Sequence, residues 1–239
     1  MRICLSLFGT TEELCEAISQ GSDADLYEIR LDLSQKLDYA RIRTATKKPL
    51  IFTALAGDDR LSKAAKFADY VDAGPKPTDF AQPIVSVHAG EADPDALWAT
   101  HSGEAITKIV LQTANYDKIE RLIELDREHP GLALCFAMGD VGAFSRILSC
   151  FAGAPWIYAS QDRRPTAPGQ FTLRELVEVY RVRRFAAQPR LYGIAGDPVT
   201  HSRSPQFHND AFALAQLPWM YLPFRCTDLP ALLRHAQAF

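Results

Sequence analysis

Short apolar runs rich in β-branched residues alternate with amphipathic stretches over the first three-quarters of the chain. These runs predict strands at residues 3–8, 26–33, 50–55, 70–73, 84–88, 106–112, 132–138 and 156–160. Apolar side chains near helical spacing predict helices at residues 12–19, 39–46, 60–68, 94–101, 116–128, 143–151 and 173–184. Residues 74–83 are rich in proline and leave little room for a helix after the fourth strand.

The alternation amounts to about eight strand-then-helix units over residues 1–185. Each helical crossover returns the chain to the same end of the sheet, so the strands pair in parallel. We therefore predict an α/β fold, a (β/α)8 TIM-type barrel. A doubly wound open sheet produces the same alternation and is the alternative.

The rhythm changes after the barrel. Residues 186–190 form a plausible linker, and the segment 191–239, called the tail below, starts again with a strand at 191–195. A helix at 208–216, a strand at 220–224 and a helix at 228–239 follow. About 50 residues are too few for a stable independent domain. We expect a C-terminal α/β fragment of a second, incomplete domain, which the barrel chemistry does not need.

Composition narrows the class of protein. The 239 residues are 47% hydrophobic and 23% charged, which is typical of an ordinary globular protein and excludes global disorder. The net charge of -3 disfavours nucleic acid as a partner, and the apolar runs are too short to cross a membrane. Five cysteines without a CxxC pair disfavour a disulfide framework or a zinc ribbon and favour a reducing cytoplasm.

Charged residues lie where the second strand should carry apolar ones. Glu28, Arg30 and Asp32 alternate with period two, so all three face one side of the predicted strand. Charged side chains are rarely buried without partners, which suggests an interior network of carboxylates around a guanidinium. A solvent-facing edge strand is the alternative.

Two further residues lie where a barrel carries out its chemistry, towards the carboxyl ends of strands. Lys108 is embedded in a β-branched strand, and His88 ends the preceding strand. Burial would lower the pKa of Lys108 and supply a neutral amine that attacks a carbonyl, with His88 as the base. A lysine that reaches solvent and a hydrogen-bonded structural histidine are the alternatives.

Two loops add binding chemistry. Arg146 lies near the start of the helix after the seventh strand, where a guanidinium can bind a carboxylate or phosphate. A solvated helix charge is the alternative. Gln170 lies in the glycine- and proline-containing loop after the eighth strand and offers both a donor and an acceptor.

The ordered set of these motifs resembles type I 3-dehydroquinate dehydratase over residues 1–185. It comprises Glu28-Ile29-Arg30-Leu31-Asp32, His88, Lys108, Met138-Gly139 before Ser145-Arg146, and Ala167-Pro168-Gly169-Gln170. The resemblance implies a lyase of the shikimate pathway with a (β/α)8 barrel. Its lysine forms a Schiff base with the small-molecule substrate, 3-dehydroquinate, and syn elimination of water gives 3-dehydroshikimate without a metal or diffusible cofactor.

The resemblance also implies a role for each matching position. Lys108 would be the nucleophile, and His88 would remove the C2 proton and protonate the departing C1 hydroxyl. The implied substrate-binding residues are Glu28 and Arg30 for the ring hydroxyls, Arg146 for the carboxylate, Gln170 closing over the substrate, Ser6 on the first strand and Thr166 in the place of a loop serine.

Three departures from the family pattern bear on rate and affinity. Leu55 stands where the family has an arginine on the third strand, and Arg60 is the donor that could replace it. The glutamate that orients the histidine falls at Asp59, one methylene shorter. His88 is followed by Ala89-Gly90 instead of Asp-Phe.

The tail resembles the start of shikimate dehydrogenase. The resemblance rests on residues 192–199 followed by His201-Ser202-Arg203-Ser204-Pro205 and His208-Asn209, and it implies that Ser202 and Ser204 bind a shikimate carboxylate. An Asn/Ser-rich turn is the alternative. That family's catalytic lysine motif and a glycine-rich nucleotide loop do not follow, so NADP would bind only if the dehydrogenase domain were complete.

These resemblances predict the front half of a bifunctional dehydratase–shikimate dehydrogenase. A degenerate barrel that binds or scaffolds without catalysis is one alternative, and a shikimate dehydrogenase whose missing half is supplied elsewhere is another. A homodimer is compatible with the sequence, which does not fix the oligomeric state.

Overall fold

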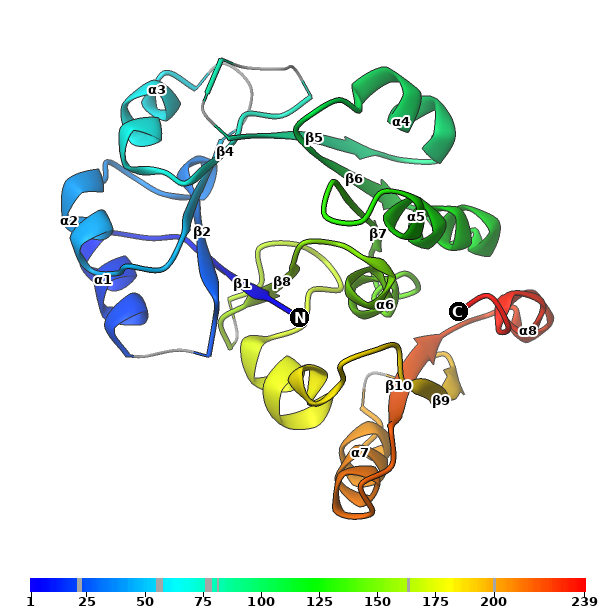
Figure 1. Ribbon diagram of the computed structural model, residues 1–239. Coiled ribbons are helices and arrows are strands. Elements are labelled where there is room, and N and C mark those ends of the chain that lie inside the picture. The colour runs from blue at the N-terminus through cyan, green and yellow to red at the C-terminus, as the bar shows by residue number, and fades with distance from the viewer. Residues whose placement is uncertain (21–22, 55–57, 76–78, 81, 163, 200) are drawn as a thin grey trace.

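Eight parallel strands form one curled sheet (Figure 1). The computed structural model describes residues 1–20, 23–54, 58–75, 79–80, 82–162, 164–199 and 201–239. The strands are β1 (Ile3–Leu7), β2 (Leu26–Arg30), β3 (Leu50–Thr53), β4 (Tyr70–Asp72), β5 (Pro83–Ala89), β6 (Ile106–Gln112), β7 (Ala133–Met138) and β8 (Ile157–Ser160). Their spatial order is β7-β6-β5-β4-β3-β2-β1-β8. No pairing joins β7 to β8 among the described residues, so the barrel predicted from the alternation is confirmed with one open seam.

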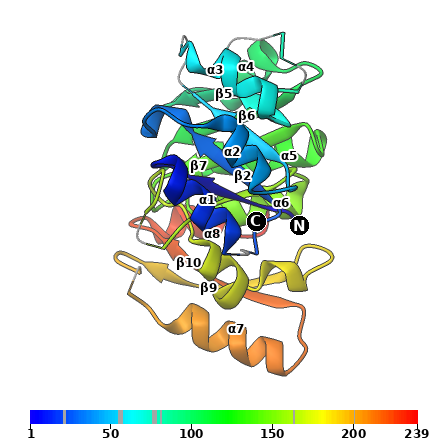
Figure 2. The same cartoon turned by 90° about the vertical axis from the view of Figure 1, so that its left-hand side faces the viewer.

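The helices follow the strands on the outside of the sheet (Figures 1 and 2). They are α1 (Thr11–Ser19), α2 (Tyr39–Thr44), α3 (Arg60–Ala64) extended by the 3-10 turn η2 (Ala65–Phe67), α4 (Pro94–His101), α5 (Tyr116–Glu128) and α6 (Ser145–Ala152). Side chains cap their first turns: Thr10 and Glu13 form a capping box on α1, and Asp93 and Asn115 accept backbone N–H groups of α4 and α5. The described residues between β4 and β5 contain no helix, as the proline-rich stretch predicts.

Two predicted barrel elements differ from the structure, and the tail helix predicted at 208–216 begins four residues earlier, at Ser204. The second strand ends at Arg30 and continues as the 3-10 turn η1 (Leu31–Leu33), so Asp32 does not stay in strand register with Glu28. The last barrel helix is not a regular α-helix. Its centre is the π-helical η3 (Glu175–Val179), it ends at Arg181 with a left-handed φ of 49°, and the 3-10 turn η4 (Val182–Arg184) follows. Hydrophobic spacing does not distinguish these helix types.

Inward-facing side chains, at every second strand position, form an apolar layer and then a polar layer inside the barrel. Inward side chains near the strand starts form a packed apolar layer: Cys4, Leu26, Ile51, Ile84, Leu134, Trp156 and Tyr158 are all buried. Two residues further along, the same faces carry Ser6, Glu28, Thr53 and Ser86. Because this apolar layer lies at the strand starts, the polar side chains two residues further on lie towards the carboxyl ends of the strands.

The tail forms a small α/β unit. Its strands β9 (Arg190–Gly196) and β10 (Trp219–Arg225) pair in parallel, with α7 (Ser204–Leu214) between them and α8 (Leu229–His235) after them. The Asn209 side chain joins α7 to β10 by exchanging two hydrogen bonds with the backbone of Tyr221, at 2.8 and 2.9 Å.

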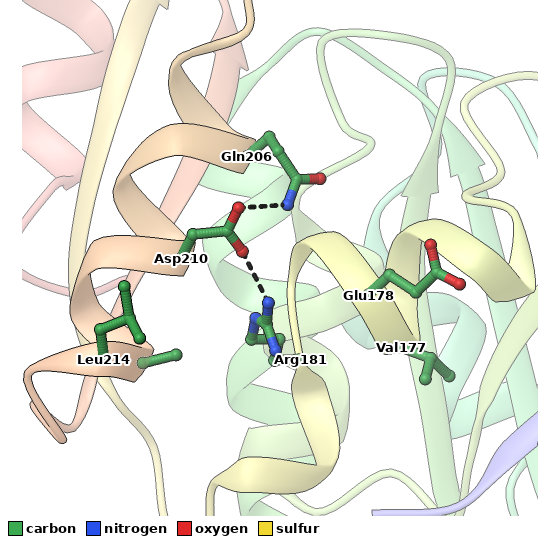
Figure 3. Close-up of a pocket in the computed structure, with 7 residues that line it drawn as sticks. Val177, Glu178, Arg181, Gln206, Asp210 and Leu214 are labelled. Atoms are coloured by element: carbon green, nitrogen blue, oxygen red, sulfur yellow. Dashed lines mark hydrogen bonds and ion pairs between the residues drawn. The ribbon is translucent and has the colours of Figure 1, made fainter.

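The tail packs against the barrel on the side of α5 and α6 (Figures 1 and 2). The His235 ring nitrogen Nδ1 lies 2.5 Å from Glu120 Oε2 on α5. At the opposite end, Figure 3 shows Asp210 of α7 accepting hydrogen bonds from Arg181 and from Gln206, at 2.6 and 2.7 Å. These contacts give the tail support that its length alone does not provide.

Candidate active site

Lys108 lies inside the barrel and is paired with Asp72. Its Nζ donates to Asp72 Oδ2 at 3.0 Å, and the two side chains are only 8% and 1% exposed. Ser86, opposite Lys108 in the β5–β6 register, donates its hydroxyl to Asp72 Oδ1 at 2.5 Å. The strands β4, β5 and β6 thus hold a buried lysine, a carboxylate and a hydroxyl in one hydrogen-bonded group.

The charge of this group corrects one expectation. Burial by itself lowers the pKa of Lys108, but the carboxylates of Asp72 and Glu28 and the hydrogen bond to Asp72 raise it more, so the net pKa lies above its usual value. The expected depressed pKa is therefore wrong for the free protein. The sequence places a lysine inside a β-branched strand, but it does not show that a carboxylate lies beside it.

His88 lies at the mouth of the same space, one inward step beyond Ser86 on β5. Surrounding protein atoms and then the positive charge of Lys108 lower the pKa of His88 to about 4, although the ring is also open to the cavity, where water limits this effect. The imidazole is therefore neutral near pH 7 and able to accept a proton.

A second hydrogen-bonded group surrounds Glu28. Its carboxylate accepts from Ser6 Oγ at 2.6 Å and from Thr53 Oγ1 at 2.8 Å. Gln170 Nε2 lies 3.4 Å from Ser6 Oγ, and Gln170 Oε1 accepts from the backbone N–H and the hydroxyl of Thr166. The loop after β8 is thereby linked to β1 and β2 across the site.

The arginine on the second strand pairs directly with only one of the two predicted carboxylates. Arg30 forms a bidentate pair with Asp32, at 2.9 and 2.6 Å, whereas Glu28 bonds Ser6 and Thr53. The expected network of carboxylates around one guanidinium is confirmed only in part. Asp32 binds Arg30 directly, because the strand ends at Arg30 and the following turn brings Asp32 back towards it, whereas Glu28 acts on Arg30 through its charge alone.

Arg146 is a buried cation with few partners. It is 3% exposed, its guanidinium carbon lies 4.3 Å from the centre of the Phe136 ring, and one terminal nitrogen donates to the carbonyl of Pro168 at 3.2 Å. Its Nε is buried without a hydrogen-bond partner. Burial lowers the pKa of Arg146 to about 10, so the group remains charged near pH 7. A buried, undersatisfied guanidinium suits an incoming carboxylate.

These side chains line two adjoining cavities, which share Arg30, His88 and Lys108. The larger has a volume of about 510 Å³ and is also lined by Asp32, Thr53, Asp72 and Ser86. The smaller, of about 40 Å³, is also lined by Ser6, Glu28, Arg146, Tyr158, Thr166 and Gln170. All eight barrel residues proposed to touch the substrate thus line one continuous region.

The residues expected to compensate for the family departures are elsewhere. Asp59 is exposed just before α3 and lines neither cavity. Arg60 does not reach in, because its guanidinium bonds Asp58 and the carbonyl of Ser34. Leu55 lies outside the described residues. Asp72 is the carboxylate nearest the reactive pair, and sequence reasoning missed it; the only signal was an acid ending a short Tyr-Val-Asp strand.

The tail serines lie apart from this region. Ser202 Oγ accepts from the backbone N–H of Ser204 at 3.2 Å, and Ser202 lines a separate cavity of about 370 Å³ between the barrel and the tail. No group of three or more His, Cys, Asp or Glu side chains suited to a metal ion occurs among the described residues. Within that same part of the chain, no helix is long and apolar enough to span a membrane.

Comparison with protein families identifies the barrel. Residues 83–185, which include His88, Lys108, Arg146 and Gln170, match the family model of type I 3-dehydroquinase. The match runs from β5 to the end of the last barrel helix. This confirms the resemblance found in the sequence.

Curated relatives extend the match beyond this domain. The bifunctional 3-dehydroquinate dehydratase/shikimate dehydrogenase, chloroplastic, of Arabidopsis thaliana is 30% identical over 88% of this chain and 41% of its own length. The shikimate biosynthesis protein AroDE of Chlamydia pneumoniae is 29% identical over 94% of this chain and 53% of its own length. The chain thus spans about half the length of these relatives or less.

Solved structures agree on the fold. The 3-dehydroquinate dehydratase of Aquifex aeolicus superimposes with a TM-score of 0.59 at 21% identity, covering 77% of this chain and 98% of that one. The dehydroquinate dehydratase and shikimate dehydrogenase from S. pombe AroM covers 96% of this chain and 54% of its own, with a TM-score of 0.53 at 21% identity. The chain therefore shares its barrel fold with these solved structures.

Proposed function

We propose that this chain is a 3-dehydroquinate dehydratase that acts through a Schiff base on Lys108. The observation that carries the proposal is the buried Lys108, hydrogen-bonded to Asp72 and sharing a cavity with a neutral His88. A nucleophilic amine with a base on the adjacent strand is what imine-assisted elimination needs. The family match and the curated dehydratases support the substrate.

The reaction begins with the lysine. Lys108 Nζ first gives up a proton, and Asp72 Oδ2 is the nearest acceptor at 3.0 Å. The free amine attacks the C3 carbonyl carbon of 3-dehydroquinate, and loss of one water gives a protonated imine. Because the iminium withdraws electrons, it acidifies the adjacent C2–H bond.

His88 then carries the proton between carbon and oxygen. Its neutral ring removes the C2 proton, and the resulting imidazolium protonates the C1 hydroxyl as the C1–O bond breaks. One water leaves and a C1–C2 double bond forms. Hydrolysis of the imine consumes one water and releases 3-dehydroshikimate and the free lysine, so the net change is loss of one water.

The other cavity residues hold the substrate in this orientation. Arg146 offers its unpartnered Nε to the carboxylate, and the absence of competing partners favours that contact. Glu28 and Arg30 are the contacts to the ring hydroxyls. Ser6, which donates to Glu28, lines the same cavity, as do Thr166 and Gln170 of the loop after β8. Asp59 is not part of this arrangement, and we assign the acidic role beside the reactive pair to Asp72.

We also propose a division of the chain. Residues 1–185 form the dehydratase barrel, residues 186–190 the linker, and residues 191–239 part of a shikimate dehydrogenase substrate-binding domain, supported by the bifunctional relatives that align across the tail. Ser202 and Ser204 are its candidate shikimate contacts. We propose that the dehydratase needs no metal or cofactor, that NADP-dependent shikimate oxidation needs further dehydrogenase elements, and that the protein is cytoplasmic. A homodimer remains open as a proposal.

Borohydride trapping tests the proposed chemistry. Reduction during turnover of 3-dehydroquinate should leave a substrate adduct on the peptide containing Lys108, and the enone of the product should absorb in the ultraviolet. Lys108→Ala should abolish the adduct and the activity, whereas Lys63→Ala, which removes an exposed lysine of α3, should change neither. His88→Ala should keep the adduct but lose about 10²–10⁴-fold in turnover. An active Lys108→Ala variant, or an adduct on another lysine, would refute the assignment.

A further inference from the structure

The tail touches the barrel where the β7 and β8 loops shape the active-site cavity. Arg225, the last residue of β10, donates to Asp197 in the turn after β9 at 2.7 Å and also pairs with Asp140 in the loop after β7. One guanidinium therefore ties the turn that precedes Ser202 to the edge of the barrel.

The loop that Arg225 holds is packed directly against the loop of Gln170. The N–H of Gly139 donates to the carbonyl of Pro168 at 3.3 Å. Gly169 has a φ of +69°, and a Cβ there would lie 2.5 Å from the carbonyl oxygen of Gly139. This close approach of two backbones requires glycine. The loops after β7 and β8 are therefore in direct backbone contact.

Residues that bind the substrate depend on these loops. Gln170 directly follows Gly169 and contacts Ser6 inside the barrel, while Arg146 donates to the carbonyl of Pro168. Gln170 also lines the cavity of about 370 Å³ between barrel and tail, whose other walls include Ser202 and Arg225. The same short loop thus closes the active site on one side and meets the tail on the other.

An aromatic contact supports the helix that carries Arg146. Phe144, just before α6, is 1% exposed, and its ring centre lies 4.9 Å from that of Phe224 and 5.0 Å from that of Phe239. Both partners belong to the tail. Gly193 on β9 lies under the Phe224 ring, where a Cβ would overlap it. Tail side chains therefore bury the residue that starts α6.

We propose that the tail positions the substrate-closing parts of the dehydratase site, with Arg225 and Phe224 as the positioning residues. Arg225 acts on the Gln170 loop through Asp140, and Phe224 acts on Arg146 through Phe144. This proposal couples the tail to the barrel, whereas the expectation from sequence is that the barrel chemistry does not need the tail. The kinetic test of this inference rests on the proposed dehydratase function, whereas the exchange measurement does not.

The kinetic test compares two exposed ion pairs between tail and barrel. Arg225→Ala should raise KM about two- to fivefold, the range that one exposed pair can supply, and leave kcat and borohydride trapping of Lys108 unchanged. Asp210→Asn breaks the Arg181–Asp210 pair, which has similar exposure but touches neither loop, and should leave KM unchanged. Arg225→Lys should restore KM in large part, because a cation beside Asp140 remains.

Two further measurements distinguish an effect on the position of Gln170 and Arg146 from a general loss of order in the protein. In a Gln170→Ala background, Arg225→Ala should add little to KM, because both changes act through the same loop. Phe224→Ala should raise KM further than Arg225→Ala does, since it uncovers Phe144 beside the helix of Arg146. If Arg225→Ala raised KM by the same factor in the Gln170→Ala background as in the wild-type protein, the proposed action through the Gln170 loop would be overturned.

Hydrogen–deuterium exchange tests the coupling independently of activity. Arg225→Ala should speed amide exchange in peptides covering residues 137–141 and 165–171, and Asp210→Asn should not. If wild-type protein shows no dehydratase activity, the proposed function fails while this measurement still judges the coupling. Unchanged exchange in both loops, or the same change with Asp210→Asn, would overturn the inference.

Discussion

The Lys108–Asp72 pair allows a quantitative test of the reasoning about the active site. Asp72→Asn keeps the shape of the side chain and an oxygen that accepts from Ser86, but it removes the carboxylate that lies 3.0 Å from Lys108 Nζ. Lys108→Met removes the ammonium and leaves the carboxylate. Each single change leaves one buried ionic group without its partner, with side-chain exposures of 8% and 1% in the intact pair.

Breaking a buried pair from one side typically costs about 3–5 kcal/mol. For a chain of this size, that corresponds to a fall in Tm of about 6–20 °C. The double variant Lys108→Met/Asp72→Asn leaves no unpaired charge, so its loss in free energy of unfolding should be smaller than that of either single variant and far below the sum of the two losses. Urea unfolding with matched m-values measures all four proteins.

The direction of the Lys108 pKa shift determines the pH at which unfolding should be measured. The pKa of Lys108 is raised in the folded state, so its contribution to stability is fully present below the usual lysine value of 10.5 and is lost as pH rises through the folded pKa. At pH 7 the whole contribution is therefore present. Additive losses in the double variant at this pH would show that the pair is not energetically coupled and would refute the reasoning.

Three further outcomes follow from the structure. Because the pKa of His88 is lowered to about 4, kcat/KM should hold as pH falls below 6.5 and decline only towards pH 4; a pH–rate profile with half its activity lost at 6.5 would contradict this. Arg146→Met should raise KM for 3-dehydroquinate about 10- to 150-fold through loss of about 1.5–3 kcal/mol of charge-assisted binding, and steady-state kinetics with an unchanged KM would exclude the carboxylate contact. Gly169→Ala should lower the free energy of unfolding by about 1–2 kcal/mol, since φ is +69° and the Cβ meets Gly139, whereas Gly103→Ala, with open space around it, should not; equal urea midpoints for both would contradict the strain.

The barrel and the candidate residues Lys108 and His88 could be picked out because each leaves a local signal in the sequence. Strand–helix alternation specifies parallel pairing, and a lysine among β-branched residues marks an unusual interior charge. Lys108 and His88 therefore stood out before any contact was known. Arg146 was found from its place at a helix start, and the structure adds that it is buried with an unpartnered Nε.

Partners across strands were harder to predict. Asp72 ends a strand of only three residues, so no periodicity marks its inward direction, and its effect on the pKa of Lys108 depends on a contact 36 residues away in sequence. Arg60 was offered as a replacement donor, but Asp58, two residues before it, already binds its guanidinium. Residue type predicts what a side chain can bind. Whether a neighbouring group already binds that side chain depends on the fold.

The tail is a larger example of contacts that could not be predicted from the sequence. Its length predicts weak ordering only if it buries its apolar side chains alone, yet Phe224 and Phe239 bury theirs against Phe144 of the barrel. The contact area that stabilises the tail is therefore also the surface that supports α6 and Arg146. Stability of the tail and geometry of the barrel site then become linked, because any change that releases these aromatic rings removes support from both. The barrel and the tail look separable along the chain, but in their packing they share the rings of Phe144, Phe224 and Phe239.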